Sequence, residues 1–226
     1  MNNTYIYSAD NLIKQEYFNI PFKEGIAMKD IIVTIGRQYG SGGRQVGKLL
    51  AQRMGVPFYD KELLTEAAKS SGFCEEIFHE NDEKPAGSFL YSLVMGANGT
   101  DALPLNNKLF LAQFDTIKEI ASKGSCVIIG RCADYALEER DNVLNVFIYA
   151  DKKVRAERAS KEYGLTAKNM EDAVNKIDKK RANYYNFYSG KKWGAAESYN
   201  ICVDSGKFGI DKTVDIIKDC VDEMSK

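Results

Sequence analysis

A short apolar strand, followed at once by a glycine-rich turn and an amphipathic helix, constrains the fold of this chain more than any other feature. The strand is predicted at 31–36 (IIVTIG), and the turn at 36–44 reads GRQYGSGGR. Apolar residues then recur at helical spacing up to Gly55, a residue type that commonly ends a helix. A continuous β-branched run is typical of a parallel strand buried on both faces. This unit therefore predicts an α/β fold.

The rest of the chain continues this alternation of strands and helices. Strands alternating with helices favour a parallel sheet covered on both faces, and ligands of such sheets bind at the carboxyl ends of the strands. We divide the chain into an N-terminal extension or arm, 1–28, and one domain, 29–226. Further strands are expected at 57–60, 126–130, 143–149 and 199–204, and helical segments at 61–72, 107–123 and 151–188, with a last helix near the C-terminus.

Composition narrows the class of partner and the compartment. The net charge is -1 and the pI about 6.0, so no overall field attracts nucleic acid or a membrane surface. No apolar run reaches the ~18 residues that a membrane span needs, and no signal peptide pattern is visible. We therefore expect a cytoplasmic protein that binds neither nucleic acid nor membrane.

The cysteines and the single histidine argue against several kinds of site. The five cysteines include no C-x-x-C pair, and three of them lie in apolar runs. We interpret them as buried thiols in a reducing compartment. One histidine makes a histidine-based zinc site or a Ser-His-Asp triad improbable. We expect no metal site built from protein ligands alone.

The glycine-rich turn has the composition of a phosphate-binding loop. Glycines let successive N–H groups point at an anion, and the following helix adds its N-terminal N–H groups. Arginine side chains can add charge-assisted contacts to phosphate oxygens. A tight turn without a ligand is the alternative. The residues expected to hold phosphate are Gly36, Arg37, Gly40, Ser41, Gly42, Gly43, Arg44 and Gln45.

The turn departs from the standard pattern G-x-x-x-x-G-K-[ST]. Counted back from the helix, Gly43 occupies the lysine position and Arg44 the hydroxyl position. A register shifted by one residue places Arg44 in the lysine position. We expect Arg44 or Arg37 to replace the lysine, and we favour Arg44 because it opens the helix.

Polar residues also stand at the ends of two other predicted strands. Arg131 follows the strand at 126–130, and its planar fork suits a phosphate. It could instead pair with a carboxylate such as Asp134. Asp60 could orient an acceptor hydroxyl, hold magnesium through water, or cap the following helix.

A basic segment lies in the last third of the chain. Between Lys152 and Lys192, twelve Lys and Arg residues stand against five Asp and Glu residues. Arg155 and Arg158 are three residues apart and so share a helix face, as do Asp178 and Arg181. Such charges could surround a transferring phosphoryl group. A solvated helix face is the other interpretation.

Four motifs in order carry a resemblance to a known family. They are 35–44 (IGRQYGSGGR), 57–64 (PFYDKELL), 127–135 (VIIGRCADY), and Asp178, Arg181, Tyr184 and Tyr185 followed by 190–194 (GKKWG). Together they resemble the cytidylate kinase-like family over roughly 29–226. The resemblance implies a three-layer P-loop NTPase fold with a five-stranded parallel sheet and helices on both faces. It also implies an acceptor-binding insertion at 73–106 and a mobile basic lid at 151–193.

The resemblance also implies an activity. A member of this family would move the γ-phosphoryl group of ATP, with Mg²⁺, to a nucleoside monophosphate such as CMP or to a similar small acceptor. A nucleotide-binding sensor without turnover and a kinase for a non-nucleotide metabolite are the alternatives, and a homo-oligomer is left open. Cytidylate kinases carry the loop lysine, and an aspartate where Cys132 stands. The residues expected to act in catalysis are Arg44, Asp60, Arg131, Arg155, Arg158 and Arg181.

Overall fold

The computed structural model describes residues 30–60, 62–72, 75–81 and 103–226. The predicted N-terminal extension therefore lies outside the described residues, as do 73–74 and 82–102 of the expected insertion. Within the described part, no helix is both long and apolar enough to cross a membrane.

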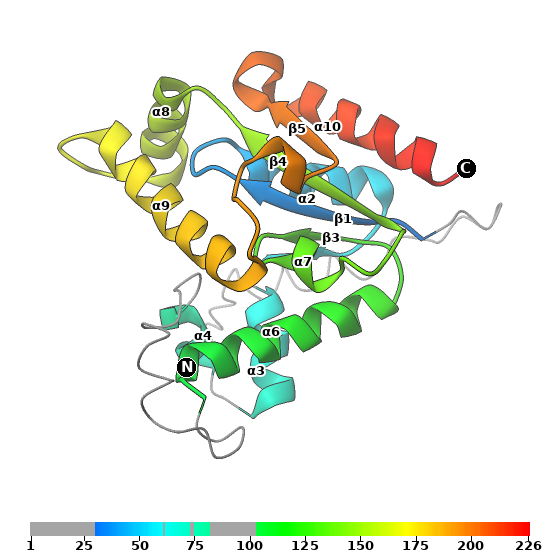
Figure 1. Ribbon diagram of the computed structural model, residues 1–226. Coiled ribbons are helices and arrows are strands. Elements are labelled where there is room, and N and C mark those ends of the chain that lie inside the picture. The colour runs from blue at the N-terminus through cyan, green and yellow to red at the C-terminus, as the bar shows by residue number, and fades with distance from the viewer. Residues whose placement is uncertain (1–29, 61, 73–74, 82–102) are drawn as a thin grey trace, which may run out of the picture.

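A five-stranded parallel sheet forms the centre of the molecule (Figure 1). The strand order is β2-β3-β1-β4-β5, which places β1 in the middle. Ile32 of β1 lies beside Cys126 of β3 on one side and Val143 of β4 on the other. The predicted strands and their parallel arrangement are confirmed. Their bounds are β1 Ile32–Arg37, β2 Phe58–Tyr59, β3 Cys126–Ile129, β4 Val143–Tyr149 and β5 Ile201–Asp204.

One face of the sheet is covered by α2 (Gly43–Met54) and α10 (Ser205–Met224). Side chains of β1 point alternately to the two faces, and Val33 and Ile35 pack on this side with Leu50 and Ile217. All four side chains are fully buried. Burying each one stabilises the fold by about 1.5–3 kcal/mol relative to leaving it exposed.

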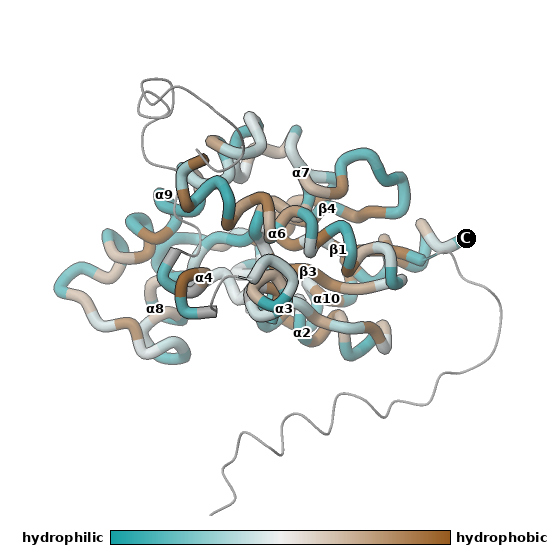
Figure 2. The backbone as a smooth tube through the Cα atoms, turned by 90° about the horizontal axis from the view of Figure 1, so that it is seen from below, coloured by the Kyte–Doolittle hydropathy of each residue, from teal (hydrophilic) through white to brown (hydrophobic). Residues whose placement is uncertain are grey.

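The other face is covered by helices that lie between β2 and β4 in the sequence. Ile32 and Ile128 point to this side and pack with Ile117 of α6 and Leu137. In Figure 2 the strands lie between α7 on one side and α2 and α10 on the other. The three-layer α/β architecture is confirmed. The helices of this part are α3 Glu62–Ser71, α4 Glu75–Asn81, α6 Leu105–Ser122 and α7 Ala133–Ala136.

Two helices, α8 (Lys152–Tyr163) and α9 (Met170–Ser189), form a hairpin that follows β4 (Figure 1). The prediction of one helical segment over 151–188 was wrong in this respect. Gly164, with φ of 65°, ends α8, and the side chain of Asn169 accepts a hydrogen bond from the N–H of Asp172 to begin α9. A short 3-10 turn, η2 (Ala196–Ser198), then leads to β5.

Aromatic side chains attach α9 to α6. The rings of Phe110 and Tyr188 stack with centroids 3.9 Å apart, and Tyr184 meets Phe110 edge-on. Tyr184 and Tyr185 are both buried. The aromatic residues of α9 therefore pack the hairpin against the body of the domain.

Candidate active site

The glycine-rich loop connects β1 to α2, as predicted. Gly40 and Gly42 have φ of 80° and 78°, a region that side chains other than glycine rarely adopt. The N–H of Val46 donates to the carbonyl of Gly42 at 2.9 Å. The N–H groups of Gly43, Arg44 and Gln45 precede this bond, so none of them has an intrahelical acceptor. The start of α2 therefore suits a phosphate.

Hydrogen bonds within the loop and to its neighbours fix its shape. The N–H of Gln38 donates to the carbonyl of Ile148 at 3.0 Å, and the hydroxyl of Ser41 donates to the carbonyl of Gln38 at 2.8 Å. The hydroxyl of Ser205 in turn donates to the carbonyl of Ser41. Ser41 is completely buried. Its hydroxyl thus shapes the loop from inside.

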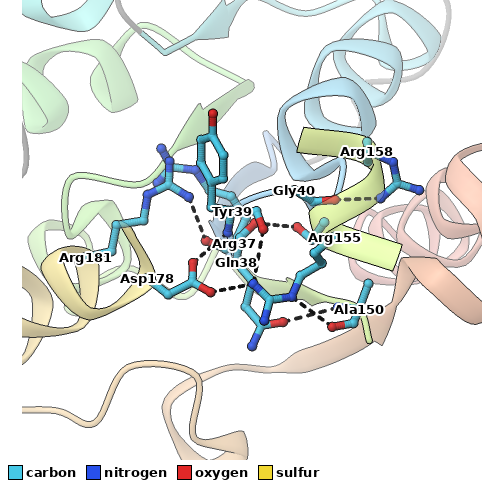
Figure 3. A network of polar contacts seen from close by, with 10 residues as sticks. Arg37, Gln38, Tyr39, Gly40, Ala150, Arg155, Arg158, Asp178 and Arg181 are labelled. Carbon is cyan, nitrogen blue, oxygen red and sulfur yellow. Dashed lines mark hydrogen bonds and ion pairs between the residues drawn. The ribbon is translucent and has the colours of Figure 1, made fainter. Parts of the chain in front are cut away.

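Helix α8 lies directly on the loop (Figure 3). Nη1 of Arg158 donates to the carbonyl of Gly40 at 2.9 Å, and Nη1 of Arg155 donates to that of Tyr39 at 3.1 Å. A Cβ atom at Gly40 would overlap the carbonyl oxygen of Arg155. The prediction that Arg155 and Arg158 share a helix face is confirmed, and that face contacts the backbone of the loop.

The end of α8 also reaches the loop. The ring of Tyr163 meets that of Tyr39 edge-on with centroids 5.7 Å apart, and burial raises the pKa of Tyr163. Gln45 lies farther out, where its side-chain amide donates to Glu162 of α8 at 2.7 Å. Gln45, one of the residues predicted to hold phosphate, thus contacts α8 in this structure.

Asp178 of α9 joins the loop to the hairpin. Its carboxylate accepts from the N–H of Tyr39 at 2.7 Å and from Nη1 of Arg155 at 2.6 Å. One turn later, Nη1 of Arg181 donates to the carbonyl of Arg37 at 3.2 Å (Figure 3). Burial raises the pKa of Asp178, although the Tyr39 N–H and the charges of Arg155 and Arg181 act in the opposite direction.

A second carboxylate, Asp60, lies at the end of β2 as predicted. It accepts from Nε of Arg44 at 2.6 Å and from Nη1 of Arg131 at 2.7 Å. Burial alone would raise the pKa of Asp60, but the charges of Arg131 and Arg37 and the two hydrogen bonds outweigh it, so the pKa is lowered. The carboxylate partner of Arg131 is therefore Asp60, and not Asp134 as one interpretation of the sequence held.

The turn after β3 has an unusual backbone that aims Arg131. Gly130, Arg131 and Cys132 have φ of 68°, 54° and 55°. For residues other than glycine this conformation costs of order 1–3 kcal/mol each, and such strain gathers at functional sites. Nη1 of Arg131 also donates to the carbonyl of Ile129 at 3.1 Å. The strained turn therefore points the side chain of Arg131 back toward the end of its own strand.

Asp134 belongs to a different contact. It accepts from the hydroxyl of Tyr185 at 2.6 Å, and burial raises its pKa. This contact ties α7 to α9.

A pocket opens where β1, the β3–α7 turn and α9 meet. Arg37, Arg131 and Arg181 line it together with Gly36 and one carboxylate, Asp134, and Tyr184, Tyr185 and Trp193 contribute aromatic surface. Three guanidinium groups in one small pocket favour an anion. Arg37 and Arg131 are 9% and 4% exposed, so water screens their charge less than it would at the surface.

Comparison with known proteins shows the family to which the chain belongs. Residues 32–207 of the chain match the model of a protein family described as the cytidylate kinase-like family. The chain belongs to the cytidylate kinase-like family. A cytidylate kinase from Methanopyrus kandleri is 24% identical over 203 residues, which cover 86% of this chain and 94% of that protein.

Solved structures show the same fold. An uncharacterized protein from Eubacterium ventriosum is 32% identical, with a TM-score of 0.65, over 85% of this chain and 98% of that one. A shikimate kinase from Bacteroides thetaiotaomicron is 15% identical, with a TM-score of 0.52, over 85% and 98% of the two chains. The fold of this cytidylate kinase-like protein is therefore that of P-loop kinases.

The predicted residues fall into two groups around the loop. Arg37, Arg131 and Arg181 line the pocket, with Asp60 and Arg44 directly beside them, whereas Arg155 and Arg158 contact the backbone of the loop from α8. Sequence reasoning did not select Asp178 as a site residue. Its spacing of one turn before Arg181 was the available signal, but its contact with Tyr39 spans 139 positions.

Proposed function

We propose that this protein is a kinase that transfers the γ-phosphoryl group of ATP to a nucleoside monophosphate of the CMP type. The pocket lined by Arg37, Arg131 and Arg181 beside the glycine-rich loop carries the proposal. It stands at the carboxyl end of β1, where ligands of parallel sheets bind. A triphosphate on the loop and a second anion in the pocket would bring the reacting groups together.

Each part of the site has a task in this reaction. The N–H groups at the start of α2 bind phosphates of ATP, and Arg131 and Arg181 bind the phosphate of the acceptor. An oxygen of that phosphate forms a bond to the γ-phosphorus while the bond from the γ-phosphorus to the β–γ bridging oxygen breaks, and ADP leaves. Positioning and positive charge supply the catalysis, and no covalent enzyme intermediate is needed.

The chain offers few direct ligands for the magnesium ion that would accompany ATP. The loop has Arg44 where other P-loops place a hydroxyl ligand, and the carboxylate of Asp60 accepts from two arginines. Magnesium usually keeps several waters and takes few protein ligands. It would neutralise phosphate charge while bound chiefly by the nucleotide, with Asp60 reaching it through water.

The nature of the acceptor rests on two arguments. Relatives from Methanopyrus kandleri and Pyrococcus furiosus carry the name cytidylate kinase. The aromatic rings of α9 beside the arginines suit a ligand with a base next to a phosphate. A non-nucleotide phosphoryl acceptor is the second candidate, because the three arginines require only an anion.

The test measures ADP formation from ATP and magnesium with each of CMP, dCMP, UMP, AMP and GMP, and with shikimate and gluconate. We expect turnover with CMP or dCMP, and a large loss for Arg181→Met. ADP formation with shikimate or gluconate alone would show that the acceptor is not a nucleoside monophosphate. Saturable ATP binding without ADP formation from any acceptor would favour a sensor and contradict the kinase.

A further inference from the structure

The loop lacks a lysine at position 43, and the backbone gives no reason for the glycine there. Gly43 is the first residue of α2, and it is absent from the residues with positive φ. Helical φ is open to every residue with a side chain. The need for glycine at this position must therefore come from space around it.

The space is taken by Arg37. A Cβ atom at Gly43 would lie 2.5 Å from Cβ of Arg37 and 3.0 Å from its Cγ. Real Cβ atoms do not approach as closely as 2.5 Å, and Cβ of Arg37 is fixed to the backbone, so no rotation of the side chain can move it away. A lysine at 43 and an arginine at 37 therefore exclude one another in this loop.

The two positions are linked in the phosphate-loop pattern. When G-x-x-x-x-G-K is laid on 37–43, its first glycine falls on Arg37 and its lysine on Gly43. Relative to the pattern, the chain has a cation where the pattern has glycine, and glycine where the pattern has the cation. The side chain of Arg37 runs over Gly43, the place from which the lysine would start.

Arg37 and Arg44 differ in where their guanidinium groups lie. Arg37 is 9% exposed and lines the pocket with Arg131 and Arg181. The side chain of Arg44 is 55% exposed, its Nε contacts Asp60, and it is not part of the pocket lining. The sequence favoured Arg44 as the replacement for lysine, but the geometry points the other way.

We propose that Arg37 is the loop cation that contacts the β- and γ-phosphates, its position exchanged with that of the lysine, and that Arg44 positions Asp60. The inference rests on the proposed binding of a triphosphate by the loop. Charge builds on the phosphate oxygens in the transition state, and a buried guanidinium can contact two of them at once. The carbonyl of Arg37 also accepts a hydrogen bond from Nη1 of Arg181. This bond joins Arg37, which we assign to the ATP phosphates, to Arg181, which we assign to the phosphate of the acceptor.

The first test measures the affinity for tripolyphosphate by calorimetry, which needs neither turnover nor a known acceptor. Arg37→Met should bind at least tenfold more weakly than the unaltered protein, and Arg44→Met less than threefold. Arg53→Met is the matched control, because Arg53 lies in the last turn of α2 and pairs with Asp211 and Asp215 of α10. The affinity of this variant should equal that of the unaltered protein. A loss at Arg44 equal to or larger than that at Arg37 overturns the assignment, as does an unaltered protein that does not bind tripolyphosphate.

The second test exchanges the two residues. Gly43→Lys alone should fold poorly or bind weakly, because Arg37 fills its space. Arg37→Gly with Gly43→Lys restores the standard pattern and should recover affinity to within about fivefold of the unaltered protein. A double variant that folds, as judged by thermal unfolding, and binds no better than Arg37→Gly would refute the exchange. If Arg37→Met does not fold, Arg37→Lys and the double variant decide the question.

These measurements distinguish failure of the kinase proposal from failure of the assignment of Arg37. In the first case, the protein would bind tripolyphosphate through Arg37 but form no ADP with any acceptor. Failure of the present inference would instead show ADP formation that survives Arg37→Met and is lost in Arg44→Met.

Discussion

Two buried aspartates contact arginines near the glycine-rich loop, and the environments of the two carboxylates differ. Asp60 contacts the side chains of Arg44 and Arg131, and the surrounding positive charge lowers its pKa. Asp178 contacts the side chain of Arg155 and the backbone N–H of Tyr39, and burial raises its pKa. The positive charge around Asp60 thus outweighs the effect of burial on its pKa. At Asp178 the effect of burial on the pKa is the larger one.

The same kind of contact, an aspartate paired with an arginine, can therefore serve two purposes: lining a ligand site or fixing the backbone. Around Asp60 the guanidinium groups of Arg37 and Arg131 border the pocket. Around Asp178 the guanidinium of Arg155 contacts backbone carbonyls of Tyr39 and Ala150, so the ion pair fixes the loop to the hairpin. We therefore expect changes at Asp60 to act on turnover, and changes at Asp178 to act on stability and on the shape of the loop.

The largest effect is expected for Arg155→Met. This change leaves the Asp178 carboxylate buried without its guanidinium, and breaking a buried pair in this way costs about 3–5 kcal/mol. Urea unfolding measures the loss. Arg158→Met is the control, since it removes one hydrogen bond to the carbonyl of Gly40 and a partly exposed ion pair with Glu162, and should cost about 1 kcal/mol. Equal losses would mean that the ion pair with Asp178 carries no special stability.

Asp60→Asn should act on the reaction instead. Without this carboxylate, Arg131 and Arg44 lose their common partner, and we expect kcat to fall by about 10²-fold, or roughly 3 kcal/mol. Steady-state kinetics with ATP and CMP measure the change. Asp178→Asn should mainly raise the KM for ATP. If both variants alter kcat to the same extent, the division of tasks between the two aspartates is wrong.

Gly40→Ala tests how closely α8 must lie on the loop. The new methyl group would overlap the carbonyl of Arg155, and φ at Gly40 is 80°. Gly164→Ala is the matched control, because φ there is 65° but nothing lies within 4 Å of the added Cβ. Backbone strain costs both variants roughly 1–2 kcal/mol, and overpacking should add about 1–3 kcal/mol at Gly40 alone. Thermal unfolding of the two variants checks the difference, and equal midpoints would contradict the close packing.

The smallest effect is a pair of opposite pH dependences. Because the folded pKa of Asp60 is lowered, its stabilisation is complete above the unfolded pKa of about 3.9 and is lost as pH falls through the folded value. Because the folded pKa of Asp178 is raised, its contribution is complete below that unfolded pKa and is lost as pH rises through the folded value. A folded pKa that differs by one from the unfolded pKa changes the free energy of unfolding by about 1.4 kcal/mol.

Urea unfolding from pH 3 to 7 measures this prediction. The advantage of the unaltered protein over Asp60→Asn should grow with pH, and its advantage over Asp178→Asn should shrink. Slopes of the same sign would remove the electrostatic distinction between the two carboxylates.

The sheet could be predicted from the sequence because its signals are local. The run from Ile31 to Ile35 and the run from Val143 to Ile148 each carry β-branched and apolar residues within a few positions. The break between α8 and α9 was also signalled, by Gly164 and Asn169, but the basic composition on both sides suggested one segment. Helix α7 has only four residues, which is too short for any periodicity.

The contacts within the site could be predicted only in part. Residue types and strand ends indicated that Arg131 and Asp60 face one crevice. Their pairing, across 71 positions, depends on the backbone of the Gly130–Cys132 turn, which no local pattern specifies. The space over Gly43 is likewise a property of how Arg37 packs, so the sequence could not choose between Arg37 and Arg44.

The hydrogen bond from the N–H of Tyr39 to Asp178 makes separation of the loop and the hairpin measurable at a single backbone amide. A backbone hydrogen held by a carboxylate exchanges with solvent deuterium only after that bond has opened. Here the donor is in the loop and the acceptor is in α9, so opening requires the two to separate. The exchange rate of this single amide therefore reports how readily the hairpin separates from the loop.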